Sequence, residues 1–442
     1  MSGVKDEIME FIMENDVKFI RLQFCDIFGR LKNIAIMPSQ LERAFDEGIG
    51  FDASAIQGFL NVEESDLFLI PDPSTISVLP WRPQQGRVVR FFCNIKRPSG
   101  ETFEGDTRHI LKRADDELKK LGFSCKVGPE CEFYLMNTDE KGVPILEPHD
   151  KASYFDVAPL DKGENVRREI CLTLEEMGIT PESSHHETGP GQHEIDFMYD
   201  TPLTSADNLI TFKSVVKTIA AKNGLFASFM PKPIIEYSGS GLHINISLSK
   251  NGVNIFDNFK KGGSAEAESF VAGILDHIEE MTLILNPTVN SYKRFGQLEA
   301  PKYITWSYNN RSPLIRVPAS RGEGSRIELR SPDPSCNPYL AFALAIFAGI
   351  DGINRGLKLL PGTDINIYSA SSEQLSGIKT LPLDLKAAKD IFMNSEFCRN
   401  VMGDLLFEKY ITVKESEWNE YELYGCENSV TDFELNKYFY TL

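Results

Sequence analysis

Residues 128–135 read GPECEFYL, which places two carboxylates, Glu130 and Glu132, two positions apart. Successive side chains of a β-strand point to opposite faces of a sheet, so both carboxylates would share one face. Cys131 and Phe133 would then point to the opposite face, toward a core. Taken alone, this segment also fits a half-solvated antiparallel strand with no special function.

Three later segments repeat this pattern of one polar and one apolar face: HHETGPGQHEIDF (185–197), GSGLHINISL (239–248) and RIELR (326–330). In the first segment, a Gly-Pro-Gly turn can bring Glu187 and Glu194 together. The polar faces of the other two carry His243, Asn245 and Ser247, and Arg326, Glu328 and Arg330. Because each apolar face must lie on a core, the four polar faces can converge on one site.

Convergence would gather five carboxylates in one place: Glu130, Glu132, Glu187, Glu194 and Glu328. Like charges this close raise one another's pKa unless cations neutralise them. Together with the imidazole of His243, they form an oxygen-rich ligand set that suits Mg²⁺ or Mn²⁺ better than zinc. Because Mg²⁺ keeps several waters, the set predicts at least two ions.

Two neighbouring histidines, His185 and His186, precede Glu187. Neighbours on a strand face opposite ways, so at most one of them can join the surroundings of Glu187. A structural histidine, hydrogen-bonded nearby, is the preferred interpretation of each.

Residues 294–330 contain six arginines but only one lysine, Lys302; the arginines are Arg294, Arg311, Arg316, Arg321, Arg326 and Arg330. The planar guanidinium binds carboxylate or phosphate through two hydrogen bonds, which favours an anion pocket. A structural network of arginine–glutamate ion pairs is the alternative. The sequence has neither the phosphate-binding loop GxxxxGK[ST] nor the dinucleotide fingerprint GxGxxG. Metals and arginines would therefore have to hold the phosphates of a bound nucleotide.

The composition is that of an ordinary globular protein of 442 residues, with a formal net charge of −18. This charge argues against nucleic acid as the main partner. The longest apolar run, 339–350, is too short to span a bilayer and predicts a buried helix. The acidic N-terminus does not look like a secretory signal, and the eight cysteines are scattered. We therefore expect a cytoplasmic protein without membrane association.

Strands and helices alternate irregularly along the chain, which predicts an α+β fold and not a doubly wound sheet. A helix at 4–15 and a strand at 17–24 open the chain, and a polar link lies at 97–106. Asp106 can cap a helix that ends at Gly122. Further helices are expected at 166–177, 209–221 and 270–285. The link divides the chain into domains at 1–103 and 104–442.

The sequence resembles the class I glutamine synthetases of bacteria and archaea. The segments that carry the resemblance are FDASAI (51–56), GPECEFYL (128–135), HHETGPGQHEID (185–196), GSGLHINISL (239–248), NSYKRFGQLEAP (290–301), NNRSPLIRVP (309–318) and RIELRSPDPSCNPYLA (326–341). The resemblance implies a small N-terminal β-grasp domain, a large α+β catalytic domain and a homo-dodecamer of two hexameric rings. Neighbouring subunits would share each active site.

The resemblance also implies a role for each matching residue. One metal would be held by Glu132, Glu187 and Glu194, and the other by Glu130, His243 and Glu328. Substrate glutamate would be bound by Glu132, Gly239, His243, Arg294, Glu299 and Arg330. ATP would be bound by Glu182, Ser247, Arg311, Arg316 and Arg326, and the catalytic residues would be Asp52, Glu299 and Arg311.

The reaction that the resemblance implies has two steps. ATP first phosphorylates the γ-carboxylate of L-glutamate. Ammonia, deprotonated with help from Asp52 and Glu299, then displaces phosphate and gives L-glutamine. A γ-glutamyl-amide ligase that uses an organic amine is one alternative, and a non-catalytic oligomer on the same fold is another. Regulatory proteins cannot be inferred from the sequence.

Overall fold

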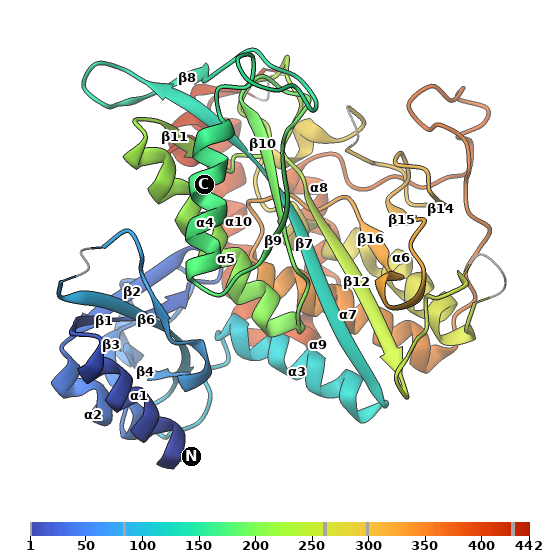
Figure 1. Cartoon of the computed structure of the whole chain (residues 1–442). Helices are drawn as coiled ribbons and strands as arrows, with labels where there is room; N and C mark the ends of the chain where they lie inside the picture. The colour runs from blue at the N-terminus through green and yellow to red at the C-terminus, as the bar shows by residue number, and fades with distance from the viewer. Residues whose placement is uncertain (1, 83–84, 260–262, 298–299, 426–428) are drawn as a thin grey trace.

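The computed structural model describes residues 2–82, 85–259, 263–297, 300–425 and 429–442. Within these ranges the strands form two sheets, one before and one after the predicted link at 97–106. Helices pack against each of the two sheets (Figure 1). The predicted α+β class is confirmed, while the border between residues 103 and 104 stays a prediction.

The first sheet belongs to the N-terminal part, drawn in blue in Figure 1. Its strands are β1 (Val17–Cys25), β2 (Leu31–Ile36), β3 (Ile49–Asp52), β4 (Asp66–Pro71), β5 (Ser77–Val78) and β6 (Arg87–Lys96). Their order is β2-β1-β6-β4-β3, and β5 also pairs with β6. Strands β1 and β6 run parallel. Helices α1 (Ser2–Glu14) and α2 (Leu41–Asp46) belong to the same part.

The second sheet is larger, and its central strands carry the polar faces predicted from the sequence. Its order is β14-β15-β16-β12-β7-β10-β9, with β8 and β11 also paired to β7 and β13 to β12. The strands are β7 (Phe123–Thr138), β8 (Pro144–Pro148), β9 (Pro181–His186), β10 (Gln192–Phe197), β11 (Phe226–Ser228), β12 (Leu242–Lys250), β13 (Val253–Asn254), β14 (Trp306–Tyr308), β15 (Ile315–Val317) and β16 (Ile327–Leu329). The apolar side chains of β7 and β12 are buried.

The helices of the larger part cover the apolar side of this sheet, where α3 and α5 pack against β7. They are α3 (Thr107–Lys120), α4 (Glu164–Glu176), α5 (Pro202–Lys222), α6 (Ala265–Leu285), α7 (Pro338–Arg355), α8 (Leu385–Met393), α9 (Glu396–Met402), α10 (Asp404–Glu422) and α11 (Asp432–Glu434). The cap at Asp106 is confirmed, because its carboxylate accepts from the backbone N–H groups of Arg108 and His109.

Two helices begin five or more residues earlier than their apolar spacing predicts. Helix α5 begins at Pro202, because the Thr201 hydroxyl caps it and proline is well tolerated in a first helical turn. Helix α6 begins at Ala265, after the cap Ser264. Capping groups, and not the apolar periodicity, set these two helix starts.

The predicted buried helix at 339–350 is confirmed as the central part of α7, whose first turns are almost fully buried. Helix α7 packs against α3, α5 and α6. Throughout the described ranges, each helix is too short or too polar to cross a lipid bilayer.

Buried polar contacts join the two parts of the chain. The Arg108 guanidinium of α3 forms ion pairs with Asp207 of α5 at 2.8 Å and with Asp72 of the N-terminal part at 2.9 Å. Asn337, the cap of α7, donates to the carbonyl of Ile27 at 3.1 Å. These contacts fix the N-terminal sheet against the helices that support the larger sheet.

Candidate functional site

The register between neighbouring strands places the predicted polar side chains side by side. The directly opposed pairs are Glu132 with Glu194, Glu130 with His243, Asn245 with Glu328, Arg316 with Glu328, and His185 with Glu194. Opposed residues of paired strands point to the same face of a sheet. Strand pairing therefore brings the polar faces of the four segments together on one side of the sheet.

One cluster consists of Glu130, His243 and Glu328, which the sequence also grouped. Nδ1 of His243 lies 3.3 Å from the Glu130 carboxylate and 3.7 Å from that of Glu328. One donor atom from each residue can be chosen so that all three lie within 4.8 Å of one another. Two carboxylates and an imidazole at this spacing could hold a divalent cation.

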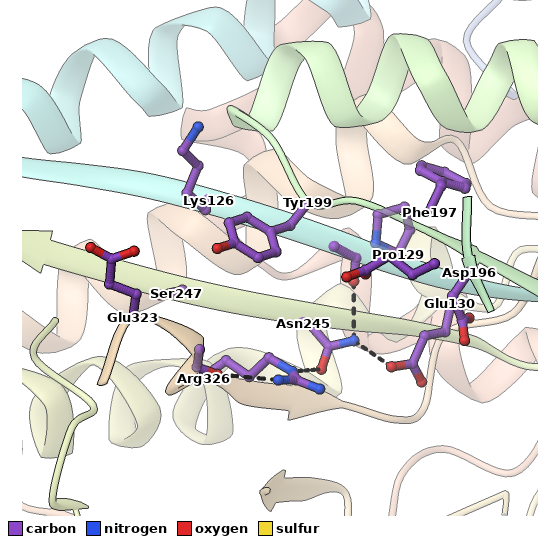
Figure 2. Close-up of a pocket in the computed structure, with 13 residues that line it drawn as sticks. Lys126, Pro129, Glu130, Asp196, Phe197, Tyr199, Asn245, Ser247, Glu323 and Arg326 are labelled. Carbon is purple, nitrogen blue, oxygen red and sulfur yellow. Dashed lines mark hydrogen bonds between the residues drawn. The ribbon is translucent and has the colours of Figure 1, made fainter. Parts of the chain in front are cut away.

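Hydrogen bonds keep the Glu130 carboxylate ionised. Burial alone would raise its pKa, but His243 and Asn245 donate hydrogen bonds to it. Together with the charge of Arg326, they lower the pKa of Glu130 to about 2. Asn245 also accepts from Nε of Arg326 at 2.9 Å, and so joins the carboxylate to the guanidinium (Figure 2).

The second group of acidic residues lies around Glu194. Its carboxylate belongs to one cluster with Glu132 and His243 and to another with His185 and Glu187. The His185 ring lies between two of these carboxylates, with Nε2 3.3 Å from Glu194 and Nδ1 3.5 Å from Glu187. His185 therefore faces the site, whereas His186 is buried behind it against Asp150.

Like charges and burial disfavour ionisation in this second group. Burial, followed by the charges of Asp196 and Glu132, raises the pKa of Glu194 well above its usual value. Burial also raises the pKa of Glu132, although His243 and the backbone N–H of Gly241 oppose the effect. The pKa of Asp196 rises to about 7, mainly because of its burial. A bound cation would relieve this repulsion.

Gln192 is a site residue that the sequence reasoning missed. Its side-chain amide donates to the Glu132 carboxylate at 3.0 Å and to the Gly239 carbonyl at 3.2 Å, and the residue is 1% exposed. Its amide oxygen accepts from the backbone N–H of Gly189. Strand alternation could have found it, because Gln192 is two residues before Glu194 and shares its face.

The arginine-rich segment contains buried ion pairs. Arg316 and Arg330 each donate to the Glu328 carboxylate, at 2.6 and 2.7 Å. The ion-pair interpretation of the sequence therefore holds for these two arginines. Glu328 is 1% exposed and Arg330 is fully buried, so each charge depends on the other for its stability.

Arg294 differs from these two arginines. It is 3% exposed, it donates to the Ser331 carbonyl at 3.2 Å, and no carboxylate among the described residues forms an ion pair with it. Burial lowers its pKa. Its side chain runs beside Gly239, where a Cβ atom would lie 2.5 Å from Cγ of Arg294. A buried guanidinium of this kind is suited to an anionic ligand.

A cavity of about 290 Å³ opens beside the first cluster (Figure 2). Three residues predicted for nucleotide binding, Glu182, Ser247 and Arg326, line this cavity. The other charged lining residues are Lys126, Glu130, Asp196 and Glu323, so acidic side chains outnumber basic ones. Figure 2 shows that the labelled side chains come from the neighbouring strands, from the segment that follows β10 and from the segment that precedes β16.

The remaining predicted residues lie elsewhere or outside the described ranges. Asp52 is exposed at the end of β3, where its carboxylate accepts from Ser54, and it does not line this cavity. Arg311 is exposed in the segment before β15. Glu299 lies outside the described residues. The structure therefore brings together the metal-ligand candidates, Gly239, Arg294 and part of the predicted nucleotide set.

Known proteins match nearly the whole length of the chain. The model for "Glutamine synthetase, catalytic domain" matches residues 104–438, and that for "Glutamine synthetase, beta-Grasp domain" matches residues 16–98. Glutamine synthetases of Clostridium saccharobutylicum and Methanosarcina mazei are each 49% identical to this chain, over 439 and 441 residues respectively. The first alignment covers 98% of both chains, and the second covers 98% of this chain and 97% of the relative.

Two solved structures also match the fold closely. They are titled "GmaS/ADP complex-Conformation 1" and "Apo GmaS without ligand". Each is 29% identical to this chain, with a TM-score of 0.85, over 97% of this chain and 98% of the solved one.

Proposed function

The chain belongs to the glutamine synthetase family, and on that premise we propose how its residues divide the work of the reaction. It is a glutamate–ammonia ligase, which joins ammonia to the γ-carboxylate of L-glutamate to form L-glutamine. Relatives that are 46–49% identical over nearly the whole chain are named glutamine synthetases, which favours ammonia over an organic amine.

The donor set fits two divalent cations. Glu130, His243 and Glu328 would hold one Mg²⁺ or Mn²⁺, and Glu132, Glu187 and Glu194 would hold the other. The raised pKa values of Glu132 and Glu194 support this proposal, because buried carboxylates that repel one another need a cation to be ionised. Such cations neutralise negative charge during phosphoryl transfer when they are bound. This convergence of acidic side chains is the observation that carries the proposal.

ATP would bind in the cavity lined by Glu182, Ser247 and Arg326. The excess of acidic side chains there would repel a bare triphosphate, so the nucleotide would bind together with cations. Arg326 is held toward the cavity by Asn245 and could contact the phosphates. Arg311 and Arg316 would complete the phosphate contacts, with Arg311 acting during the transfer.

Glutamate would bind next to the second acidic group. Arg294 would bind a substrate carboxylate, since this buried guanidinium forms no ion pair with a described residue. Gly239 leaves room for that contact, because any side chain there would collide with Arg294. Arg330, Glu132 and His243 would line the same subsite. The γ-carboxylate would then point toward the transferring phosphoryl group.

Ammonia would be delivered at a boundary between two subunits. Asp52 of one subunit would bind ammonium at the site of the next, with Glu299 helping to remove the proton. The exposure of Asp52 in a single chain supports this arrangement, because its carboxylate is open to another molecule. The assembly would be a dodecamer of two hexameric rings, in the cytoplasm.

The test is release of ADP by the purified protein with Mg²⁺, ATP and glutamate. The proposal expects release that depends on ammonium and gives glutamine in equal amount. Release that needs methylamine in place of ammonium would instead assign an amide ligase. Mixing inactive D52A and E328Q subunits should restore part of the activity if subunits share sites, and no recovery would contradict sharing.

A further inference from the structure

A buried carboxylate, Asp150, lies behind the turn that joins the two acidic residues Glu187 and Glu194. Asp150 is 4% exposed. One of its oxygens accepts from the backbone N–H of Gly191 at 2.9 Å, from that of Ala152 at 3.2 Å and from Nε2 of His186 at 2.9 Å. The other accepts from the backbone N–H of Lys162 at 3.1 Å. Asp150 thus ties together segments that are distant in the sequence.

Two of these donors hold the turn between β9 and β10. His186 immediately precedes Glu187, and its Nδ1 donates to the Glu187 carbonyl at 2.6 Å. Gly191 closes the turn with a φ of +65°, and a Cβ there would lie 2.8 Å from the carbonyl oxygen of Leu135. Both ends of the turn are therefore held in place, one through His186 and the other through Gly191. Its two arms carry Glu187 and Glu194.

The other two donors, the backbone N–H groups of Ala152 and Lys162, close a loop over residues 150–162. In this loop Tyr154 and Phe155 stack with ring centroids 4.1 Å apart, and both meet the His185 ring edge-on. Phe155 has a φ of +60°, an unusual value for a bulky residue, and its N–H donates to the His186 carbonyl. The loop therefore contacts the His185 ring, whose two nitrogens lie near Glu187 and Glu194.

We propose that Asp150 is a positioning residue for the metal site at Glu187 and Glu194. It holds the backbone of Glu187 through His186, the turn through Gly191, and His185 through the loop at 150–162. Asp150 would act through these segments and is not itself one of the proposed metal ligands. Mutation of an outer partner that orients metal ligands typically lowers metal affinity or activity about 10–100-fold. The inference rests on the proposed metal function of Glu187 and Glu194.

The test compares D150N with D139N in the full-length protein. Asp139 is a matched control, because its carboxylate accepts from two backbone N–H groups, those of Lys141 and Val143, in an exposed turn. The readouts are the Mn²⁺ dissociation constant, from the EPR signal of free Mn²⁺, and the thermal unfolding temperature. We expect D150N to weaken Mn²⁺ binding about tenfold or more, the usual effect of losing an outer partner. D139N should bind as the wild type does.

A second variant, H186Q, covers the case in which D150N does not fold. Glutamine can still donate toward Asp150, but it cannot also donate to the Glu187 carbonyl, so Mn²⁺ binding should weaken. A folded D150N that is less stable but binds Mn²⁺ normally would make Asp150 purely structural and would overturn the inference. Normal Mn²⁺ binding by H186Q would overturn it in the same way if D150N fails to fold.

E194Q, measured alongside, separates the inference from the function on which it rests. If E194Q weakens Mn²⁺ binding and D150N does not, only the role of Asp150 is wrong. If E194Q binds Mn²⁺ like the wild type, the metal assignment is wrong, and the positioning role of Asp150 fails with it.

Discussion

Glu132 of β7 and Glu194 of β10 are direct cross-strand partners, so a half-buried and a buried carboxylate face each other on the same side of the sheet. The pKa of each is raised, first by burial and then, for Glu194, by neighbouring negative charges. Like charges in direct opposition destabilise a sheet unless a ligand compensates them. Repulsion within this pair therefore lowers the free energy of unfolding of the metal-free protein. The same pair offers two carboxylates to a cation.

Without metal, the E194Q protein should be more stable than the wild type. With metal bound, it should be less stable than the wild type. In EDTA at pH 8, loss of the buried charge should raise the unfolding temperature by about 1–2 °C, which corresponds to about 1 kcal/mol for a domain of more than about 300 residues. With saturating Mn²⁺ the wild type should be the more stable of the two. Differential scanning fluorimetry in both conditions measures this. An E194Q protein that is less stable in both would contradict the role of repulsion.

E328Q should abolish glutamine formation and also reduce stability. The Glu328 carboxylate joins the metal-ligand cluster and compensates Arg316 and Arg330. Neutralising one member of a buried ion pair costs about 3–5 kcal/mol, because the partner charge stays buried. Urea unfolding and the ADP-release assay give the two readouts. Normal turnover in a folded E328Q protein would refute the metal assignment.

R294K should weaken glutamate binding despite keeping the charge. A lysine cannot reproduce the fork of a buried guanidinium, so KM for glutamate should rise at least tenfold. KM for ATP should change little, because Arg294 does not line the cavity proposed for the nucleotide. R321K, at an exposed position, is the control. Equal increases of both KM values would argue against a dedicated glutamate contact.

Q192L should weaken metal binding although Gln192 is not a proposed ligand. Its amide donates to Glu132 and to the Gly239 carbonyl, so leucine leaves both acceptors without that donor. Loss of such an outer partner costs about 10–100-fold in affinity or activity. Mn²⁺ titration of Q192L, with exposed Gln40 changed to leucine as control, measures this. Unchanged affinity would mean that Gln192 only fills space.

His277 should contribute stability that decreases as pH rises. Burial alone would lower its pKa, but hydrogen bonds with Glu280 and Asp351 raise it above its usual value. Because the pKa of His277 is higher in the folded protein, its contribution to stability is complete below about pH 6.5, the pKa of histidine in the unfolded chain. The contribution is lost as the pH rises through the pKa of the folded protein.

The comparison that checks this is wild type against H277Q. The wild type should be more stable by ~0.5–1 kcal/mol at pH 6, and the difference should shrink by pH 9. Arg355, which pairs with both Asp276 and Asp351, stays charged throughout and does not contribute to this change. A difference between the two proteins that does not depend on pH would show that the His277 charge plays no part.

Much of the local structure could be predicted from the sequence, because it depends on near neighbours. The cap at Asp106 and the turn at 189–191 follow from side-chain chemistry within a few residues. The start of α5 at Pro202 was missed, because apolar spacing does not detect a capping threonine. Gln192 and Asp150 were missed for another reason: their importance lies in contacts with distant segments.

The sequence alone determined which side chains share a strand face, since alternation within a strand is a local property of the backbone. That was enough to place Glu130 with Glu132, and His243 with Asn245. Only the tertiary structure decided which strand lies beside which, and therefore which polar faces share a site. The register that opposes Glu132 to Glu194 and Glu130 to His243 depends on how β10, β7 and β12 pack on a common core. A shift of one residue would turn a whole strand face away from the site, and no local pattern excludes such a shift.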